Sequence, residues 1–319
     1  MTSVSMTSVR TTPANSSQAN AASASELLDK VGPRAKPLII TVFGDTIAPR
    51  GGTIWLGSLI ELMQSLGLSE RLVRTGVYRL VREGWLKARQ NGRRSFYTIT
   101  RDGLDSFAEA DARIYANGPL TWDNKWTMVQ TLPDATPKDR KKMRNLLTWH
   151  GFGQLSPTMM IKPGSDTKNL NQVLKAANLT NASIIFISDL DQHADKQSII
   201  ANGWSLQNLS DAYERLLCCF ADTDKPATNN KNTKDSDQNA FITRSLLIHQ
   251  YRRILLKDPQ LPNELLPPEW NGEKARQLVA QTYRTLSPQA DRFIIEKMQC
   301  GNKQCPSPTS AYHSRFISG

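Results

Sequence analysis

Residues 69–100 constrain the fold of this chain more than any other stretch. Apolar residues recur through its first half at helical spacing, with one glycine completing the stripe. They are Leu72, Val73, Gly76, Val77, Leu80 and Val81. Ser69 lies where a helix N-cap is expected, and Gly84 lies where a helix would end. The first half is therefore predicted to form an amphipathic helix.

A β-hairpin is predicted directly after this helix. The β-prone residues 85–89 and 95–100 flank Asn91-Gly92, a pair that is typical of two-residue hairpin turns. Basic side chains lie on the polar face of the helix and along the hairpin. They are Arg71, Arg74, Arg79, Arg82, Lys87, Arg89, Arg93 and Arg94. With only two acidic residues in the stretch, these eight leave a local excess of six charges, more than half of the chain's net charge of +11. This concentration indicates a polyanionic partner.

The segment before this stretch supplies a second predicted helix. Residues 55–66 carry Leu56, Leu59, Ile60 and Met63 at helical spacing, and Gly67-Leu68 forms a short link. Two helices joined by a short turn containing glycine indicate a helix-turn-helix, whose second helix enters the major groove of DNA. The alternative is a solvated helix whose arginines bind nothing. The basic hairpin favours DNA, with these predicted contacts: Arg71, Arg74, Thr75, Tyr78, Arg79, Arg82, Lys87, Arg89, Arg93 and Arg94.

Several motifs resemble the PaaX family of bacterial repressors of phenylacetic acid catabolism. The motifs are VFGDTIAPRGGTIWLGSLIELMQSLGLSERLVRTGVYRLVREGW, GRRSFYTIT, TWHGFG, and RSLLIHQYRRILLKDPQL followed by ELLPPEW. The resemblance covers most of residues 37–298. It implies a multidomain α+β protein with an N-terminal winged helix-turn-helix, a central ferredoxin-like α+β module and a C-terminal helical domain. It also implies that phenylacetyl-CoA is the effector that releases the repressor from operator DNA.

Composition and this resemblance together predict five segments. They are a disordered tail (residues 1–35), a winged-helix domain (36–117), a ferredoxin-like domain (118–200), a helical domain with a mobile polar loop at 222–238 (201–300) and a second disordered tail (301–319). The apolar run at residues 38–43 fits either a helix or a strand. In the helical domain, separate helices are expected at residues 206–220, 240–257, 273–286 and 288–298.

The secondary-structure elements of the central module are expected in the order strand, helix, strand, helix, strand along the chain. Similar folds occur in CRISPR-associated endoribonucleases, which carry an aspartate at the end of their first strand. Here the first predicted strand, residues 125–131, contains no acid, and the nearest is Asp134 in a loop. We therefore expect the module to pack or to form a homodimer. The main alternative from another class is a nuclease or an acyl-CoA-binding enzyme that holds its substrate in the basic region.

No nucleophile set, phosphate loop or paired metal motif is apparent in the sequence, so we expect no enzyme, no metal and no cofactor. The effector site is predicted at Trp149, Arg244, His249, Arg252 and Arg253. Arginine suits a CoA thioester because guanidinium binds phosphate bidentately. The alternative is an exposed basic helix face with a hydrogen-bonded core histidine. A relative of the family could also sense another aryl-CoA.

Cys218, Cys219, Cys300 and Cys305 form no zinc-site spacing and are expected to be free thiols. No apolar run approaches the roughly 20 residues of a membrane span, and no signal-peptide core opens the chain. The protein is therefore expected to be cytoplasmic, with double-stranded operator DNA, an acyl-CoA effector and a second copy of the chain as partners.

Overall fold

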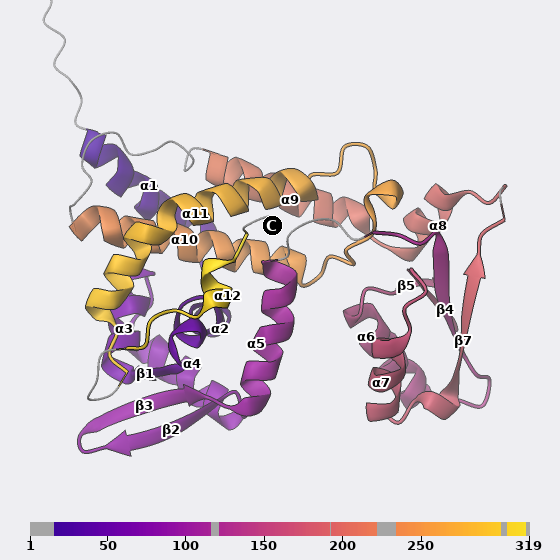
Figure 1. Cartoon of the computed structure of the whole chain (residues 1–319), viewed down its shortest axis with the longest axis horizontal. Coiled ribbons are helices and arrows are strands. Elements are labelled where there is room, and N and C mark those ends of the chain that lie inside the picture. Colours follow the sequence, from indigo (N-terminus) through magenta and orange to yellow (C-terminus); the bar gives the residue numbers. More distant parts are fainter. Residues whose placement is uncertain (1–15, 116–120, 192, 222–233, 301–304, 317–319) are drawn as a thin grey trace, which may run out of the picture.

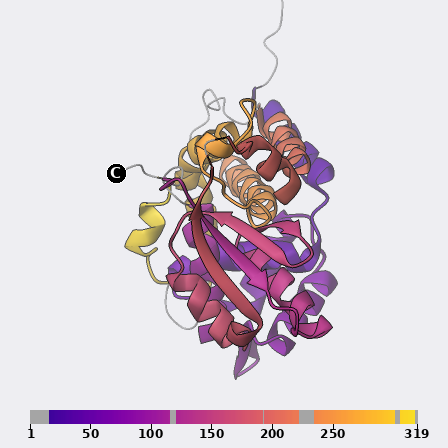
Figure 2. The same ribbon diagram turned by 90° about the vertical axis from the view of Figure 1, so that its right-hand side faces the viewer.

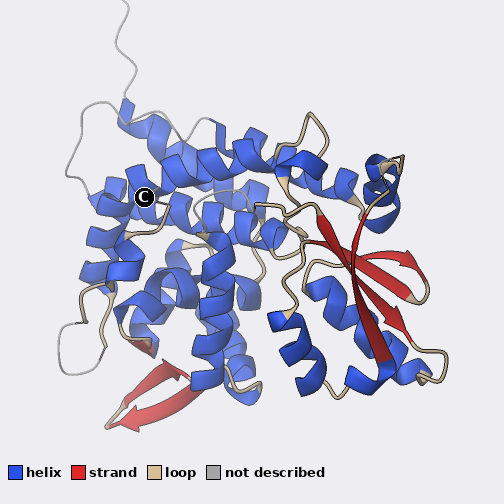
Figure 3. Cartoon of the chain, turned by 45° about the vertical axis from the view of Figure 1, so that its right-hand side comes forward, coloured by secondary structure: helices blue, strands red, loops and turns tan. Residues whose placement is uncertain are grey.

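The chain forms a large body and a smaller α+β body, seen side by side in Figure 1. The computed structural model describes residues 16–115, 121–191, 193–221, 234–300 and 305–316, with side chains described from residue 24 onward. The large body is built from both ends of the chain, and the small body is built from its middle. Figure 3 shows the strands gathered in two places, a hairpin at one end of the large body and the sheet of the small body.

The N-terminal part of the large body is mostly helical. Its helices are α2 (Ala35–Val42), α3 (Leu56–Ser65), α4 (Glu70–Arg82) and α5 (Arg101–Ile114), with the short turns η1 (Phe43–Ile47) and η2 (Ala48–Arg50) after α2. Its strands are β1 (Thr53–Trp55), β2 (Leu86–Asn91) and β3 (Arg94–Ile99), which form an antiparallel sheet in the order β1-β3-β2. The run left open by the sequence is thus helical, and the predicted helix and hairpin of residues 69–100 are confirmed. Strand β1 was not predicted, because three residues carry no measurable periodicity.

The C-terminal part of the large body packs onto the N-terminal part. It contains α9 (Leu206–Phe220), α10 (Lys234–Leu255), η5 (Asn263–Leu265), α11 (Gly272–Lys297) and α12 (Ser310–His313). One continuous hydrophobic core runs through both parts, from Leu38 and Val77 to Leu246 and Phe293. The two regions that were expected to be separate domains therefore share a single core.

Two expectations about the helical region are wrong. The two helices expected at residues 273–286 and 288–298 are one helix, α11, which ends at Lys297 and has Pro288 inside it. The hydrogen bond that Pro288 cannot make is outweighed by burial of Ala290, Phe293 and Ile294 beyond it. The polar loop is shorter than expected, because residues 234–238 already belong to α10. The remaining loop residues, 222–233, lie outside the described part of the chain.

The expectation of two disordered tails is also wrong for the residues that the structure describes. Helix α1 (Ser16–Val31) packs against α10 and buries Ala24, Leu27 and Val31. After α11 the chain returns to the large body, where α12 is followed by the buried Arg315 and Phe316. Composition misses both segments because a few well-placed apolar residues are enough to fix a short segment onto an existing core.

A buried carboxylate joins the two parts of the large body. Asp45, in η1, accepts hydrogen bonds from the hydroxyl groups of Tyr115 (2.7 Å) and Tyr283 (2.9 Å). It also accepts from the guanidinium groups of Arg315 (3.1 Å) and Arg244 (3.3 Å). Burial alone would raise the pKa of Asp45, but the two guanidinium groups and the two phenols hold that pKa below its ordinary value. The N-terminal part is thus tied to α10, α11 and the C-terminal segment through one ionised side chain.

The small body is a four-stranded antiparallel sheet with helices on it, and Figure 2 shows this sheet in front of the large body. Its elements are β4 (Lys125–Thr131), α6 (Pro137–Trp149), β5 (Gly153–Ser156), β6 (Met159–Pro163), α7 (Lys168–Ala176), η3 (Thr180–Ala182), β7 (Ser183–Asp189) and α8 (Lys196–Gly203). The strand order is β5-β6-β4-β7. Val129 of β4 packs with α6 and α7, while Trp126 on the opposite face packs with Ile200 and with Leu265 of the C-terminal part. Strand β5 was not predicted.

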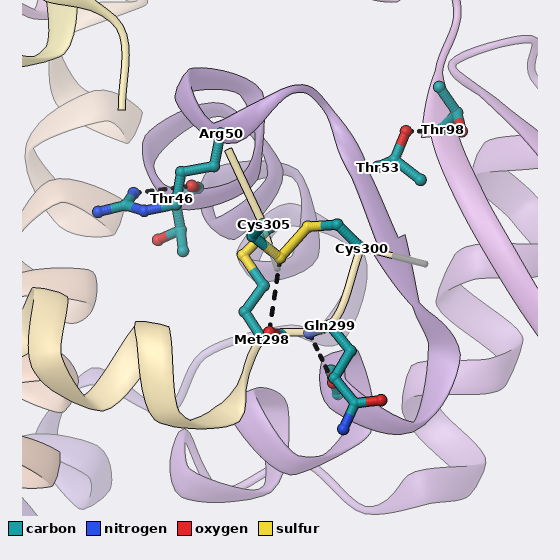
Figure 4. Close-up of a disulfide and its surroundings, with 9 residues drawn as sticks. Thr46, Arg50, Thr53, Thr98, Met298, Gln299, Cys300 and Cys305 are labelled. Carbon is teal, nitrogen blue, oxygen red and sulfur yellow. Dashed lines mark hydrogen bonds between the residues drawn. A yellow bond between two sulfur atoms is a disulfide. The ribbon is translucent and has the colours of Figure 1, made fainter. Parts of the chain in front are cut away.

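The expectation of four free thiols is wrong for one pair. Cys300 and Cys305 form a disulfide, while Cys218 and Cys219 are free. The Cα atoms of Cys300 and Cys305 lie 5.1 Å apart, within the range that a disulfide requires, and the sequence spacing alone does not show this distance. Figure 4 shows this disulfide with Arg50 and the paired Thr53 and Thr98 around it, and Cys300 lines the same hollow as those two threonines of the hairpin sheet.

Candidate nucleic-acid interface

Helix α4 is held on its apolar side and exposed on its basic side. Val73, Val77 and Leu80 are fully buried. Gly76 lets α4 approach α2 closely, because a Cβ atom there would lie 2.5 Å from Cδ1 of Ile39 unless the end of that side chain moved. Leu72 departs from the predicted stripe, since its side chain is 49% exposed. Ser69 is the N-cap residue, although its side chain makes no capping hydrogen bond.

The predicted contact residues of α4 all lie on its exposed face, but some of their side chains are paired within the protein and others are not. Arg74 is engaged by Glu70, one turn earlier, at 2.6 Å. Arg71, Arg79 and Arg82 are exposed and make no hydrogen bond or ion pair through their side chains within the described residues. The remaining two predicted contacts on this face are Thr75, whose hydroxyl donates to the Arg71 carbonyl at 2.9 Å, and Tyr78, which is 67% exposed.

The hairpin places a second set of basic side chains next to α4, because β2 packs against that helix. Lys87 and Arg89 are opposite Thr98 and Phe96 in the ladder and border a hollow of about 790 Å³ on the outer face of the sheet. Arg93 is exposed beside the turn, where Gly92 adopts a φ of 59°. Arg94 is fixed instead: its guanidinium stacks 4.7 Å above the Trp55 ring and donates to the Gln299 side chain at 3.1 Å.

The structure separates the five predicted effector residues. Arg244 is completely buried, where it pairs with Asp45 and Asp291 and so serves the core network. His249 is also buried, with its Nδ1 3.0 Å from the Thr41 hydroxyl, and burial together with nearby arginines lowers its pKa to about 4. Arg253 is exposed. None of these three borders the cavity that contains the other two predicted residues.

Trp149 and Arg252 do come together. They line a cavity of about 280 Å³ between the two bodies, with Trp85, Ser106, Glu109, Ala110, Arg113 and Leu256 as the other lining residues. Arg113 is fully engaged, donating to the carbonyl oxygens of Leu255 and Asp258 and to the Gln260 side chain. The guanidinium of Arg252 makes no hydrogen bond or ion pair within the described part of the chain, and burial lowers its pKa. The cavity therefore combines two indole rings with one cation available to an anionic ligand.

The sequence pointed to Trp149 and Arg252 but not to Trp85 or the other lining residues. Trp85 precedes the hairpin, Trp149 ends α6 and Arg252 lies in α10, and the docking of the small body brings these distant positions together. Within the described residues there is no group of three or more metal-ligating side chains that could hold an ion. The same residues include no helix long and apolar enough to cross a membrane.

An exposed basic helix packed against a basic hairpin is the arrangement of a DNA-binding protein. Comparisons with known proteins agree. The sequence matches the family models described as PaaX-like protein (residues 34–103), PaaX protein central Cas2-like domain (119–200) and PaaX-like protein C-terminal domain (204–296). It is 36% identical over 284 residues to the transcriptional repressor PaaX of Escherichia coli K12, covering 88% of this chain and 89% of that protein. The chain belongs to the PaaX family.

This membership confirms the expectation of a regulator rather than an enzyme. Among solved structures, the fold is similar to that of uncharacterized protein Rv0674 from Mycobacterium tuberculosis. The TM-score is 0.50 at 21% identity, over 74% of this chain and 89% of that one. At this identity the likeness concerns the fold alone.

Proposed function

We propose that the protein is a transcriptional repressor of phenylacetic acid catabolic genes that binds operator DNA through an N-terminal winged helix-turn-helix. The observation that carries this proposal is the set of unpaired, exposed arginines on α4 (Arg71, Arg79 and Arg82). In this function α3 braces α4, α4 enters the major groove, and the hairpin contacts the neighbouring backbone through Lys87, Arg89 and Arg93. The relation to a named transcriptional repressor supports the proposal.

We further propose that two copies of the chain act together, joined through the ferredoxin-like small body. Strand β7 is an edge strand of its sheet, and Ile184, Phe186 and Ile187 are 44%, 46% and 50% exposed. An apolar edge strand with unpaired backbone groups favours pairing with another strand. A two-fold dimer would present two α4 helices to a palindromic operator.

Replacing Phe186 with aspartate should convert a dimer into a monomer, because a charge on the shared edge would be desolvated in the interface. Size-exclusion chromatography with light scattering would measure the mass. The matched control is Ile295→Asp, which places the same charge on α11 at an isoleucine that is 57% exposed. A wild-type monomer, or a Phe186→Asp variant that remains dimeric, would contradict the β7 interface.

We propose that phenylacetyl-CoA releases the repressor by binding in the cavity between the two bodies. The indole rings of Trp85 and Trp149 suit the phenyl group, and Arg252 suits a phosphate of the CoA portion. A ligand in this position contacts α5 of the large body and α6 of the small body. Its binding would therefore favour one relative orientation of the two bodies, and with it one spacing of the α4 helices in a dimer.

A release assay tests both the function and the cavity. Duplexes selected by the wild-type protein from a random pool are bound, and phenylacetyl-CoA is titrated in. Arg252→Ala should bind DNA normally but require at least about tenfold more effector, since a lost charge-assisted hydrogen bond is worth about 1.5–3 kcal/mol. Arg253→Ala, whose side chain lies outside the cavity, is the control. If Arg252→Ala is released at the same effector concentration as wild type, the cavity is not the effector site. If only another aryl-CoA releases the protein, that compound and not phenylacetyl-CoA is the effector.

A further inference from the structure

Leu72 is an aliphatic side chain on a surface that otherwise consists of polar groups and one phenol. The helical stripe predicts that it is buried, yet its side chain is 49% exposed. In α4, residues three and seven positions later lie on the same face, and these are Thr75 and Arg79, both exposed. Two of the eight large apolar side chains exposed in the described residues, Leu72 and Tyr78, lie on this one helix. The basic face of α4 therefore also carries apolar contact area.

The fold does not use Leu72 for packing. Val73, Val77 and Leu80 are at most 1% exposed and fill the contact with the core, and Gly76 meets α2 directly. By contrast, Leu72 keeps half of its surface in solvent at the third position of α4. Residues near the N-terminus of a recognition helix are those that contact base edges in the major groove.

A leucine offers no hydrogen-bond donor or acceptor, which limits what it can recognise. In the major groove every base edge presents polar groups, and thymine alone among the four bases adds an apolar one, its C5-methyl group. Apolar contact with that methyl is how a side chain of this kind discriminates between base pairs. The neighbouring Arg71 and Arg79 supply the electrostatic contacts that place the helix on the duplex.

We propose that Leu72 is a specificity-determining residue that contacts the 5-methyl group of a thymine in the operator. This inference rests on the proposed function, in which α4 enters the major groove. It assigns to Leu72 a role in choosing the sequence and not in general affinity for DNA. The arginines bind any duplex, whereas Leu72 favours those with thymine at one position of each half-site.

The test replaces each thymine of a duplex selected by the wild-type protein, one at a time, with deoxyuridine, which lacks only the methyl group. At the contacted position the wild-type affinity should fall about fourfold, the effect of one buried methyl group. Leu72→Ala should bind the thymine and deoxyuridine duplexes equally. Leu104→Ala, which truncates a 46% exposed leucine of α5 away from α4, should keep the wild-type preference.

The outcomes separate this inference from the function on which it rests. Wild-type binding that is insensitive to deoxyuridine at every position would overturn the role of Leu72. A Leu72→Ala variant that still prefers thymine by the wild-type factor would also overturn it, because another residue would then contact the methyl group. Failure of the wild-type protein to select any duplex would overturn the proposed function itself. Because Leu72 is half-exposed, the variant is expected to fold, which circular dichroism would verify.

Discussion

Replacing Asp45 with asparagine is expected to lower the free energy of unfolding by about 3–5 kcal/mol, the usual effect of removing one partner from a buried ion pair. Asparagine keeps the volume of the side chain but removes the charge that Arg244 and Arg315 share. Both guanidinium groups are almost fully buried, so neither can turn to water instead. Denaturant unfolding at neutral pH, followed by circular dichroism, would measure the change.

The same variant should show a changed dependence on pH. The pKa of Asp45 in the folded protein lies below its ordinary value of 3.8. Its charge therefore stabilises the fold fully above pH 3.8, and this contribution is lost as the pH falls below 3.8 through the lowered pKa. The difference in stability between wild type and Asp45→Asn should thus be constant from pH 7 to about 4.5 and shrink below 3.8.

Two features keep this measurement specific. His249, whose pKa is lowered from 6.5 to about 4, destabilises wild type and variant equally as the pH falls through that range, so its effect cancels in the difference. Asp134→Asn, at an exposed carboxylate with no side-chain partner in the described residues, is the matched control and should leave stability unchanged. A stability of Asp45→Asn equal to that of wild type would show that the network does not join the two parts of the large body.

The sequence could predict elements whose signals are local. Helix α4 and the hairpin follow from the periodicity of Val73, Val77 and Leu80 and from the Asn91-Gly92 turn. The polar face of α4 followed from the same periodicity. Leu72 was misplaced because it lies at the boundary between the two faces, where periodicity alone does not determine exposure.

Features that depend on contacts between distant segments could not be predicted. Asp45 stands alone in an apolar run, which was a usable signal, but nothing in its surroundings identifies Arg244 or Arg315, 199 and 270 residues away, as its partners. Arg244 was predicted to bind the effector for a similar reason. Its position in a family motif does not show whether it forms an ion pair in the core or a contact at the surface. Sequence motifs located important residues but not the side chains they meet.

Replacing Arg71 and Arg79 together with glutamine is expected to weaken binding to a selected duplex about 100-fold, at about 1–3 kcal/mol for each contact. Both side chains are exposed and free of ion pairs in the described residues, so the loss would fall on DNA and not on the fold. If both contact phosphates, the slope of log affinity against log salt should decrease by about 1.8, because each such contact contributes about 0.9. Gel-shift titrations between about 50 and 200 mM salt would measure both the loss of affinity and the change in the salt slope.

The matched control uses the arginine that the fold already engages. Glu70→Gln with Arg74→Gln removes an ion pair from the same helix face without changing the net charge, and is expected to alter affinity by less than about threefold. A loss in this control as large as that of the Arg71 and Arg79 variant would mean that Arg74 leaves Glu70 to contact DNA. Undiminished binding by the Arg71 and Arg79 variant would mean that α4 does not enter the groove. The ion pair with Glu70 thus separates Arg74, which is already paired on the surface of α4, from the arginines whose side chains are available to contact an operator.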